Sequence, residues 1–467
     1  MHLKVLINRL LHQIAVCVKL LRDAWALAVE ALCWVELRRS SGRLALTKAS
    51  KQLGVQDQSV IGLAHKLVLE TVRRQNFIDQ MINTLLKPNS INDFPLGVRA
   101  FLRLYAYEIK IKGSDSYEKA VNIAKVGRSI LGWRRLKSAE EVLGPLLSLE
   151  PKEVLKGLND AEKVSLQTFQ PYWFVKYCFK LFGRHEALRY FESTISRTPI
   201  YIRVNTLKMP DEEELLKKIG AEGITLEKAQ GLLHTYKVVK KKKPLVRTAS
   251  FSNGLFYIQD KASCLAAEVA APEAGMTLLD VCAAPGAKTT YLAQLMENQG
   301  IIYSVDYSKR RMKVWERGIK RMGVKNAQPA AWDACNPLPI HDVKADLVVL
   351  DPPCTSTGAF SRTPSAKWRL SKRSIKNMAA IQWKMLNNCA NLVKEGGGLV
   401  YSTCSITVEE NEILIERFLK LNPDFTLAET KPRIGLPGLR GQTSSQRLYP
   451  HIHECNGFFI AKLAKYG

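Results

Sequence analysis

The sequence predicts a multidomain protein with an all-α N-terminal domain, a small α+β segment and a C-terminal α/β domain. Three observations predict this fold class. Up to about residue 145, apolar residues recur every three or four positions, as on amphipathic helices. From about 150 to 255, helical patterns are mixed with an alternating strand pattern. After residue 255, short apolar strands alternate with amphipathic helices, which indicates a doubly wound, mostly parallel sheet.

Length and charge limit the function classes. The 467 residues are enough for two or three domains with buried cores. Lys and Arg together number 69 against 43 for Asp and Glu, a net charge of +26, which favours a polyanionic partner and nucleic acid first. The alternative is a basic protein whose surplus charge only maintains solubility.

The cysteines and the N-terminus predict an intracellular protein without a metal. Ten cysteines occur without a C-x-x-C pair, so a zinc site has no ligand spacing and no metal is expected. Charged residues interrupt the apolar N-terminus, so neither a signal sequence nor a membrane span is expected. We expect a cytoplasmic monomer.

The helical patterns of the first domain, residues 1–148, break at Pro88, Asn89 and Ser90. The stretch "GVRAFLRLYAYEIKIKGSDSYEKAVNIAKVG" resembles the second half of NusB, an RNA-binding helical bundle. A generic helical adaptor is the alternative. The next segment, residues 149–255, contains the strand pattern "PIYIRV" and the lysine-rich run "KVVKKKK", which is either a phosphate-contacting edge or a solvated turn.

In a doubly wound sheet, ligands bind outside the carboxyl ends of the strands. "LLDVCAAPGAKTT" reads as strand, tight turn and helix, and the free amides of a helix N-terminus attract polar ligand groups. Asp306 and Asp333 follow the next two strands, placed to bind ribose hydroxyls and an adenine amino group. A single Asp of this kind is often a helix N-cap, but with Asp280 three successive strands end in an acid, which favours a nucleoside pocket.

Two later strands each end in a cysteine, Cys354 in "ADLVVLDPPC" and Cys404 in "GGGLVYSTCS". A free cysteine is commonly a small buried apolar residue. Neighbouring strands lie about 4.8 Å apart, so two such strand ends can present both thiols to one ligand. The joint placement, with Asp351 beside one thiol, favours a shared chemical role.

The motifs "DVCAAPGAKTTYLAQLM", "SVDYSKRR", "DPPCTSTGAFSRTPSAKWRL", "LVYSTCSITVEENE" and "RLYPHIHECNGFFIAKL", with "RVNTLK" and "FYIQDKAS" upstream, resemble the NOP/Sun (NSUN) family of RNA 5-cytosine methyltransferases. The likeness spans residues 150–467 and is strongest to the Fmu/RsmB branch, which carries a NusB-like domain. The resemblance implies an RRM-like α+β segment and a Rossmann-like class I fold that binds S-adenosylmethionine through Cys282, Ala283, Ala284, Pro285, Gly286, Ala287, Lys288, Asp306, Asp333 and Asp351. Ala287 departs from the family's usual glycine and would strain the turn if the position needs positive φ.

The same resemblance implies the catalytic roles. Cys404 is the expected nucleophile at cytosine C6, Cys354 assists release of the methylated base, and Asp351 binds the N3/N4 edge of the base. Two groups are needed for two steps. C5 becomes nucleophilic only after a thiolate adds at C6, and after methyl transfer the C5 proton must be removed so that the thiolate can leave. Lys288 and Arg362 are the candidate cations that lower the pKa of the thiol.

The segment after Cys354, "FSRTPSAKWRLSKRSIKNM", is basic and contains no acid. Such a loop suits phosphate contact and base stacking on a single strand or flipped cytosine. The residues expected to contact RNA are Lys288, Arg362, Lys367, Trp368 and Arg369. A solvated helix start is the alternative.

The sequence therefore predicts a methyltransferase acting on ribosomal RNA, or else on tRNA, with a catalytic domain at residues 256–467. Two alternatives stay open. One is a non-catalytic RNA-binding assembly factor that keeps the fold, which Ala287 favours and the retained cysteines oppose. The other is DNA cytosine methylation, which would require Cys354 and not Cys404.

Overall fold

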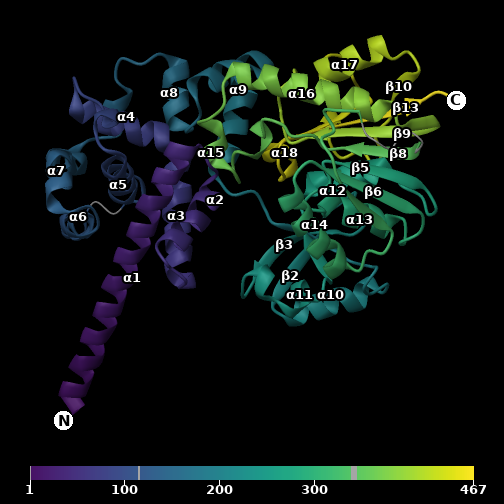
Figure 1. Ribbon diagram of the computed structural model, residues 1–467. Coiled ribbons are helices and arrows are strands. Elements are labelled where there is room, and N and C mark those ends of the chain that lie inside the picture. The colour runs from purple at the N-terminus through teal and green to yellow at the C-terminus, as the bar shows by residue number, and fades with distance from the viewer. Residues whose placement is uncertain (1, 114–115, 338–343) are drawn as a thin grey trace. The chain divides into compact units, whose positions relative to one another are not determined.

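The computed structural model describes residues 2–113, 116–337 and 344–467, with side chains from residue 18 onward (Figure 1). The chain divides into two compact units. The first contains residues 1–195 and the short segment Thr363–Arg369; the second contains Ser196–Arg362 and Leu370–Gly467. None of the described helices is long and apolar enough to cross a membrane.

The first unit is all helical, as the sequence predicts. Its helices are α1 (His2–Arg38), α2 (Gly42–Gln52), α3 (Gln58–Arg73), α4 (Gln75–Leu86), α5 (Leu96–Ala106), α6 (Tyr117–Leu131), α7 (Trp133–Ser148), α8 (Asp160–Gln167), α9 (Tyr172–Ile195) and the short α15 (Pro364–Lys367). The predicted break at residues 88–90 is confirmed, because α4 ends at Leu86. Apolar faces of α1 to α8 share one core, in which Trp25, Phe101 and Tyr105 are the largest fully buried apolar side chains.

Arginines of the NusB-like stretch are part of the packing of this unit. Arg103 is 6% exposed and donates to Asp79 and Glu36 at 2.7 and 2.6 Å. Arg99 also pairs with Glu36, at 2.8 Å. Buried cations are retained where carboxylates compensate them, so these two side chains tie α5 to α1 and α4.

A small four-stranded antiparallel sheet begins the second unit. Its order is β2-β3-β1-β4, from β1 (Tyr201–Val204), β2 (Ile224–Lys228), β3 (Thr235–Lys241) and β4 (Phe256–Ile258), with helices α10 (Glu212–Ala221) and α11 (Ala249–Ser252). β1 is buried along its whole length. Arg203 satisfies its buried guanidinium on Gln259 at 3.2 Å, on Thr290 at 2.8 Å and on Gln294. The α+β character is as predicted.

The large sheet has nine strands, in the order β11-β12-β13-β9-β8-β5-β6-β7, with β10 paired to β13. The strands are β5 (Thr277–Val281), β6 (Ile301–Asp306), β7 (Ala327–Ala331), β8 (Ala345–Leu350), β9 (Val393–Thr403), β10 (Phe425–Ala428), β11 (Leu436–Pro437), β12 (Gln446–Leu448) and β13 (Phe458–Lys465). The pairs among β5 to β9 are parallel, and the pairs that involve β10 to β13 are antiparallel. The sheet is therefore mixed, and its parallel part carries the predicted site.

Helices cover both faces of this sheet (Figure 1). One apolar core joins the strands to α12 (Lys261–Ala270), α13 (Ala287–Leu295) and α14 (Lys309–Met322). A second core joins the opposite side chains of the strands to α16 (Lys372–Ala390) and α17 (Glu412–Leu421). Successive residues alternate between the two cores, as Leu278 and Leu279 do on β5, because side chains of a strand alternate between faces. The short α18 (Pro450–His453) precedes β13.

Candidate active site

The sheet topology brings the loops after β5, β8 and β9 to one edge. β8 lies between β5 and β9, and its register with β9 pairs Leu350 with Tyr401. The residues that follow, Asp351 and Ser402, are therefore level, and Ser402 Oγ lies 3.4 Å from Asp351 Oδ1. Ends of parallel strands form the ligand edge of such sheets.

The two strand-end cysteines meet at this edge. Cys354 Sγ and Cys404 Sγ are 3.2 Å apart, and both residues are partly exposed. Ser356 Oγ lies 3.4 Å from Cys404 Sγ and 3.9 Å from Cys354 Sγ. The sequence reasoning placed the two thiols on one ligand, and the structure brings them into direct contact.

The contact makes the two thiols unequal. The hydrogen bond from Cys354 lowers the pKa of the Cys404 thiol, with help from Ser356 and against the effect of burial. The same hydrogen bond, together with burial, raises the pKa of the Cys354 thiol well above its ordinary value. The contact thus favours ionisation of Cys404 over ionisation of Cys354.

The two cations proposed to activate the thiol are each paired with a carboxylate. Lys288 is 6% exposed, and its Nζ lies 2.5 Å from Asp351 Oδ2. Arg362 pairs with Asp260 at 3.1 Å and donates to Thr198 Oγ1 at 2.8 Å. The main cause of the lowered Cys404 pKa is accordingly the hydrogen bond from Cys354. Lys288 fixes the orientation of Asp351.

The turn after β5 is built from small residues and two positive φ angles. Cys282 has φ 65° and Gly286 has φ 104°. A Cβ on Gly286 would lie 3.2 Å from Trp315 Cδ1, so glycine is required there for both reasons. Ala287 is the first residue of α13 and does not have positive φ. The strain expected from Ala287 does not arise.

Acidic groups flank this turn. Asp306, buried at the end of β6, accepts from Ala284 N at 3.3 Å and pairs with Arg311 at 3.0 Å. Asp333 is exposed after β7 and accepts from Cys335 N at 3.0 Å. Acceptor carboxylates beside a helix N-terminus and a turn of small side chains fit the hydroxyl and amino groups of a nucleoside. Across the described side chains, no cluster of His, Cys, Asp or Glu could hold a metal ion.

Comparison with known proteins agrees with this arrangement. The 16S rRNA methyltransferase RsmB/F family matches residues 267–464, and the NusB family matches residues 22–127. The probable ribosomal RNA small subunit methyltransferase B of Bacillus subtilis is 31% identical over 454 residues, which cover 94% of this chain and 98% of that protein. The chain belongs to the RsmB/F methyltransferase family. Members of the RsmB/F family use S-adenosylmethionine.

This chain is also similar to other RNA methyltransferases. The tRNA (cytosine(72)-C(5))-methyltransferase of Pyrococcus horikoshii is 39% identical over 51% of this chain and 60% of that protein. The crystal structure of PH0851 has a TM-score of 0.79 and 30% identity over 95% of this chain and 99% of that chain. NSun6 from Pyrococcus horikoshii with SFG, an S-adenosylmethionine analogue, has a TM-score of 0.59 and 28% identity over 64% of this chain and 98% of that one.

Three of the residues expected to contact RNA lie in the segment Thr363–Arg369, which belongs to the helical unit. Lys367 is 2% exposed and donates to the carbonyls of Arg73, at 2.8 Å, and Phe169. Trp368 Nε1 donates to Val72 O at 2.6 Å, and Arg369 is exposed with two bonds to backbone carbonyls, of Ser365 and Arg39. The Lys367 amine is directed at protein carbonyls, which is inconsistent with phosphate contact. RNA contact by Arg369 and Arg362 stays a prediction.

Two groups at this edge, Ser356 and Glu410, were not predicted from the sequence. Ser356, beside both thiols, has φ 55°, an uncommon backbone conformation for a residue other than glycine, and such strain often occurs at functional sites. Glu410 is completely buried beside the loops that contain Cys354 and Cys404, which we call the thiol loops. The stretch "STCSITVEENE" places three acids shortly after the thiol, Glu409, Glu410 and Glu412, so the sequence signals an acidic group there without singling out Glu410.

Proposed function

We propose that this chain methylates cytosine C5 in ribosomal RNA, through a covalent bond between Cys404 Sγ and cytosine C6. The observation that carries the proposal is the 3.2 Å contact between two strand-end thiols with opposite pKa shifts, beside the carboxylate of Asp351. A single buried thiol would fit packing equally well, but a thiolate and a thiol in contact suit a reaction that both forms and breaks a carbon–sulfur bond.

The first step uses the lowered pKa of Cys404. Its thiolate forms a bond to C6 of a cytosine that is single-stranded or flipped out, because C6 is inaccessible in a stacked helix. The electron pair of the C5–C6 double bond then makes C5 nucleophilic. Asp351, held by Lys288, hydrogen-bonds the N3/N4 edge and stabilises the charge that develops there.

S-adenosylmethionine supplies a methyl group on a sulfonium centre when it is bound. The turn Cys282–Lys288, Asp306 and Asp333 are the residues that would hold it. After C5 carries the methyl group, its proton passes to a base, the C5–C6 double bond re-forms and the bond from C6 to Cys404 Sγ breaks. Cys354, kept protonated by its raised pKa, donates a hydrogen bond to the departing thiolate.

The test is methyl transfer from labelled S-adenosylmethionine to unmodified ribosomal RNA and tRNA. We expect no product from Cys404→Ala and a protein–RNA adduct, stable on a denaturing gel, from Cys354→Ala. Cys33→Ala is the matched control, since Cys33 is a partly buried thiol of the helical unit. Wild-type rates in both site variants would exclude the mechanism.

The same experiment separates the alternatives. RNA binding without transfer by the wild type would favour an assembly factor. Transfer to DNA that depends on Cys354 and not on Cys404 would favour a DNA methyltransferase. We propose ribosomal RNA over tRNA because the near full-length relative in Bacillus subtilis carries a ribosomal RNA name. We also propose a cytoplasmic location for the reduced thiol pair.

A further inference from the structure

Glu410 is a buried carboxylate that accepts hydrogen bonds from five groups. Its Oε1 accepts from Thr355 N at 2.8 Å and from Gln382 Nε2 at 3.0 Å. Its Oε2 accepts from the hydroxyls of Thr355, Ser405 and Thr407 at 2.5, 2.6 and 2.7 Å. A carboxylate has about four lone-pair sites, so its accepting capacity is fully used.

The donors come from both thiol loops. Thr355 directly follows Cys354, and Ser405 directly follows Cys404. One side chain therefore holds the residue next to each reacting sulfur. Gly358 N adds a further tie between the loops by donating to Cys404 O at 2.9 Å. Hydrogen bonds to an ionised acceptor are roughly twice as strong as neutral ones, so the carboxylate is the strongest link between the loops.

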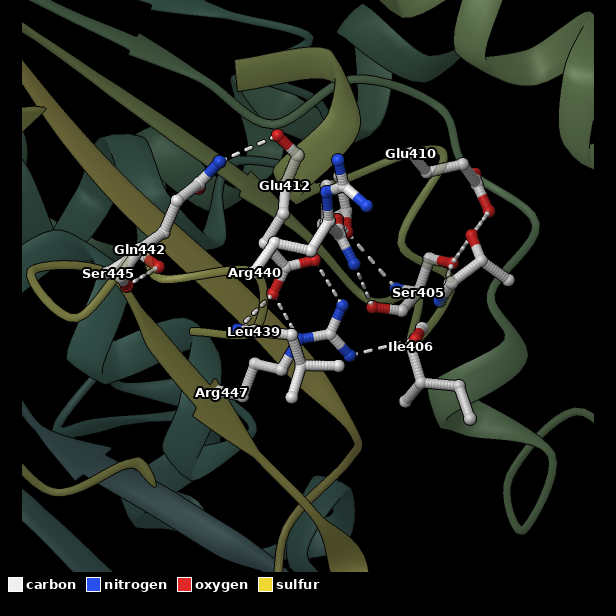
Figure 2. Close-up of polar contacts among 12 residues, drawn as sticks. Ser405, Ile406, Glu410, Glu412, Leu439, Arg440, Gln442, Ser445 and Arg447 are labelled. Atoms are coloured by element: carbon white, nitrogen blue, oxygen red, sulfur yellow. Dashed lines mark hydrogen bonds and ion pairs between the residues drawn. The ribbon is translucent and has the colours of Figure 1, made fainter. Parts of the chain in front are cut away.

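A second carboxylate anchors the same region from the other side (Figure 2). Glu412 binds Arg447 in a bidentate pair at 2.5 Å, and both side chains are at most 1% exposed. Arg447 Nη1 then donates to Ile406 O at 2.8 Å, two residues beyond Cys404. The loop after β9 is thus held by Glu410 toward the Cys354 loop and by Arg447 toward β12.

We propose that Glu410 is a positioning residue that keeps the Sγ atoms of Cys354 and Cys404 in contact. This deepens the proposed function and rests on it for its catalytic meaning. Among the described residues, Glu410 forms its hydrogen bonds to neighbours of the two cysteines and not to either sulfur, so its effect passes through Thr355 and Ser405. A buried carboxylate is tolerated only when it is fully hydrogen-bonded. The donors around Glu410 must therefore keep fixed positions, which is consistent with a geometric role.

Charge and geometry give opposite expectations for Glu410. Its negative charge raises the pKa of the Cys404 thiol, whereas the Cys354 contact that it maintains lowers this pKa more strongly. Neutralising Glu410 would make Cys404 more reactive at neutral pH if charge dominated. It would make Cys404 less reactive if positioning dominates.

The experiment compares Glu410→Gln with Glu268→Gln in the full chain, without RNA or cofactor. Glu268 is the matched control: a buried carboxylate on α12 whose hydrogen-bond partners, Leu233 N at 3.0 Å and the Tyr291 hydroxyl, lie outside the thiol loops. Diamide, which takes up the two thiol hydrogens, measures sulfur proximity through the rate of Cys354–Cys404 disulfide formation. The disulfide is detected by peptide mass spectrometry.

We expect Glu410→Gln to slow disulfide formation at least about tenfold, by loss of a charge-assisted bond, and to move Cys404 alkylation to higher pH. Glu268→Gln should leave both unchanged. An unchanged disulfide rate, or Cys404 alkylation that becomes faster at neutral pH, overturns the proposal. If Glu410→Gln does not fold, Thr355→Val removes one donor and should give a smaller change in the same direction. Because no methyl transfer is measured, this result is separate from the test of the proposed function.

Discussion

The buried pair of Glu412 and Arg447 gives a prediction whose size follows from burial. Glu412→Gln keeps the shape of the side chain but leaves the guanidinium, which is 1% exposed, without a negative partner. Breaking a buried ion pair from one side costs about 3–5 kcal/mol, because the remaining charge is neither solvated nor compensated. The loop that contains Ile406 also loses a fixed anchor.

A matched pair lies one turn further along the same helix, α17. Arg440 binds Glu416 with two nitrogens, at 3.1 and 2.9 Å, but these side chains are 48% and 35% exposed. Solvent screens such a pair, so Glu416→Gln should change stability little. Both variants remove from α17 one negative charge that pairs with an arginine, but only Glu412 is buried. Glu416 also has a second partner in Lys420, at 3.1 Å.

Hydrogen exchange of the β9 and β13 amides measures the difference locally. A loss of 3–5 kcal/mol corresponds to roughly 160- to 4,600-fold faster exchange for Glu412→Gln, against less than about sixfold for Glu416→Gln. Glu412→Leu combined with Arg447→Met should recover most of the protection, since both charges are then removed. Equal effects of the two single variants would refute the reasoning.

Four further outcomes follow from the site and its surroundings. Cys354→Ala removes the hydrogen bond that lowers the Cys404 pKa. Alkylation of Cys404 by iodoacetamide should therefore become roughly tenfold or more slower at pH 7, and the pH profile of alkylation should move to higher pH. An unmoved pH profile would contradict this. Burial raises the pKa of Asp280 from 3.8 to about 7, so the stabilising contribution of this side chain is full below about pH 4 and is lost as pH rises through 7. Asp280→Asn should therefore stabilise the second unit at pH 8, by on the order of 4 kcal/mol at most, and not at pH 4. Thermal unfolding at the two pH values measures the difference. Ala287→Gly should cost about 0.5–1 kcal/mol in α13 and leave calorimetric affinity for S-adenosylmethionine within about twofold, whereas a large gain would restore the strain hypothesis. Lys367→Met should destabilise the helical unit by about 1–3 kcal/mol, because two carbonyls lose their donor, without changing the salt dependence of RNA binding; a slope reduced by about one would return Lys367 to the RNA interface.

The fold class could be predicted because the spacing of apolar residues along the sequence matches the side chains that the helices and strands bury. The alternation of short apolar strands with helices identified the parallel part of the sheet, and the strand-end rule then selected Asp351, Cys354 and Cys404. The antiparallel strands after β9 carried a weaker signal, since β11 and β12 have two and three residues. The sequence predicts a mostly parallel sheet, but the extent of its antiparallel part was not anticipated.

Properties that depend on backbone angles or distant partners could not be predicted. In the turn after β5, positive φ occurs at Gly286 and Cys282, and the sequence gives no means to assign it to particular members of this run of small residues. Lys367 and Trp368 have the composition of an RNA-binding loop, yet their donors meet carbonyls almost 200 or more residues away. Amino-acid composition shows which groups a segment offers, but the tertiary fold decides which groups they contact.

The short segment Thr363–Arg369 has a consequence for biosynthesis. It supplies the helical unit with the buried Lys367 amine and the Trp368 indole, but residues 196–362 of the other unit are made before it. At about 5–20 residues per second, the helices that leave the ribosome first wait on the order of ten to thirty seconds for this last piece. A fragment that stops at residue 195 would carry the exposed carbonyls of Arg73, Phe169 and Val72 permanently, so the helical unit is a poor candidate for expression on its own.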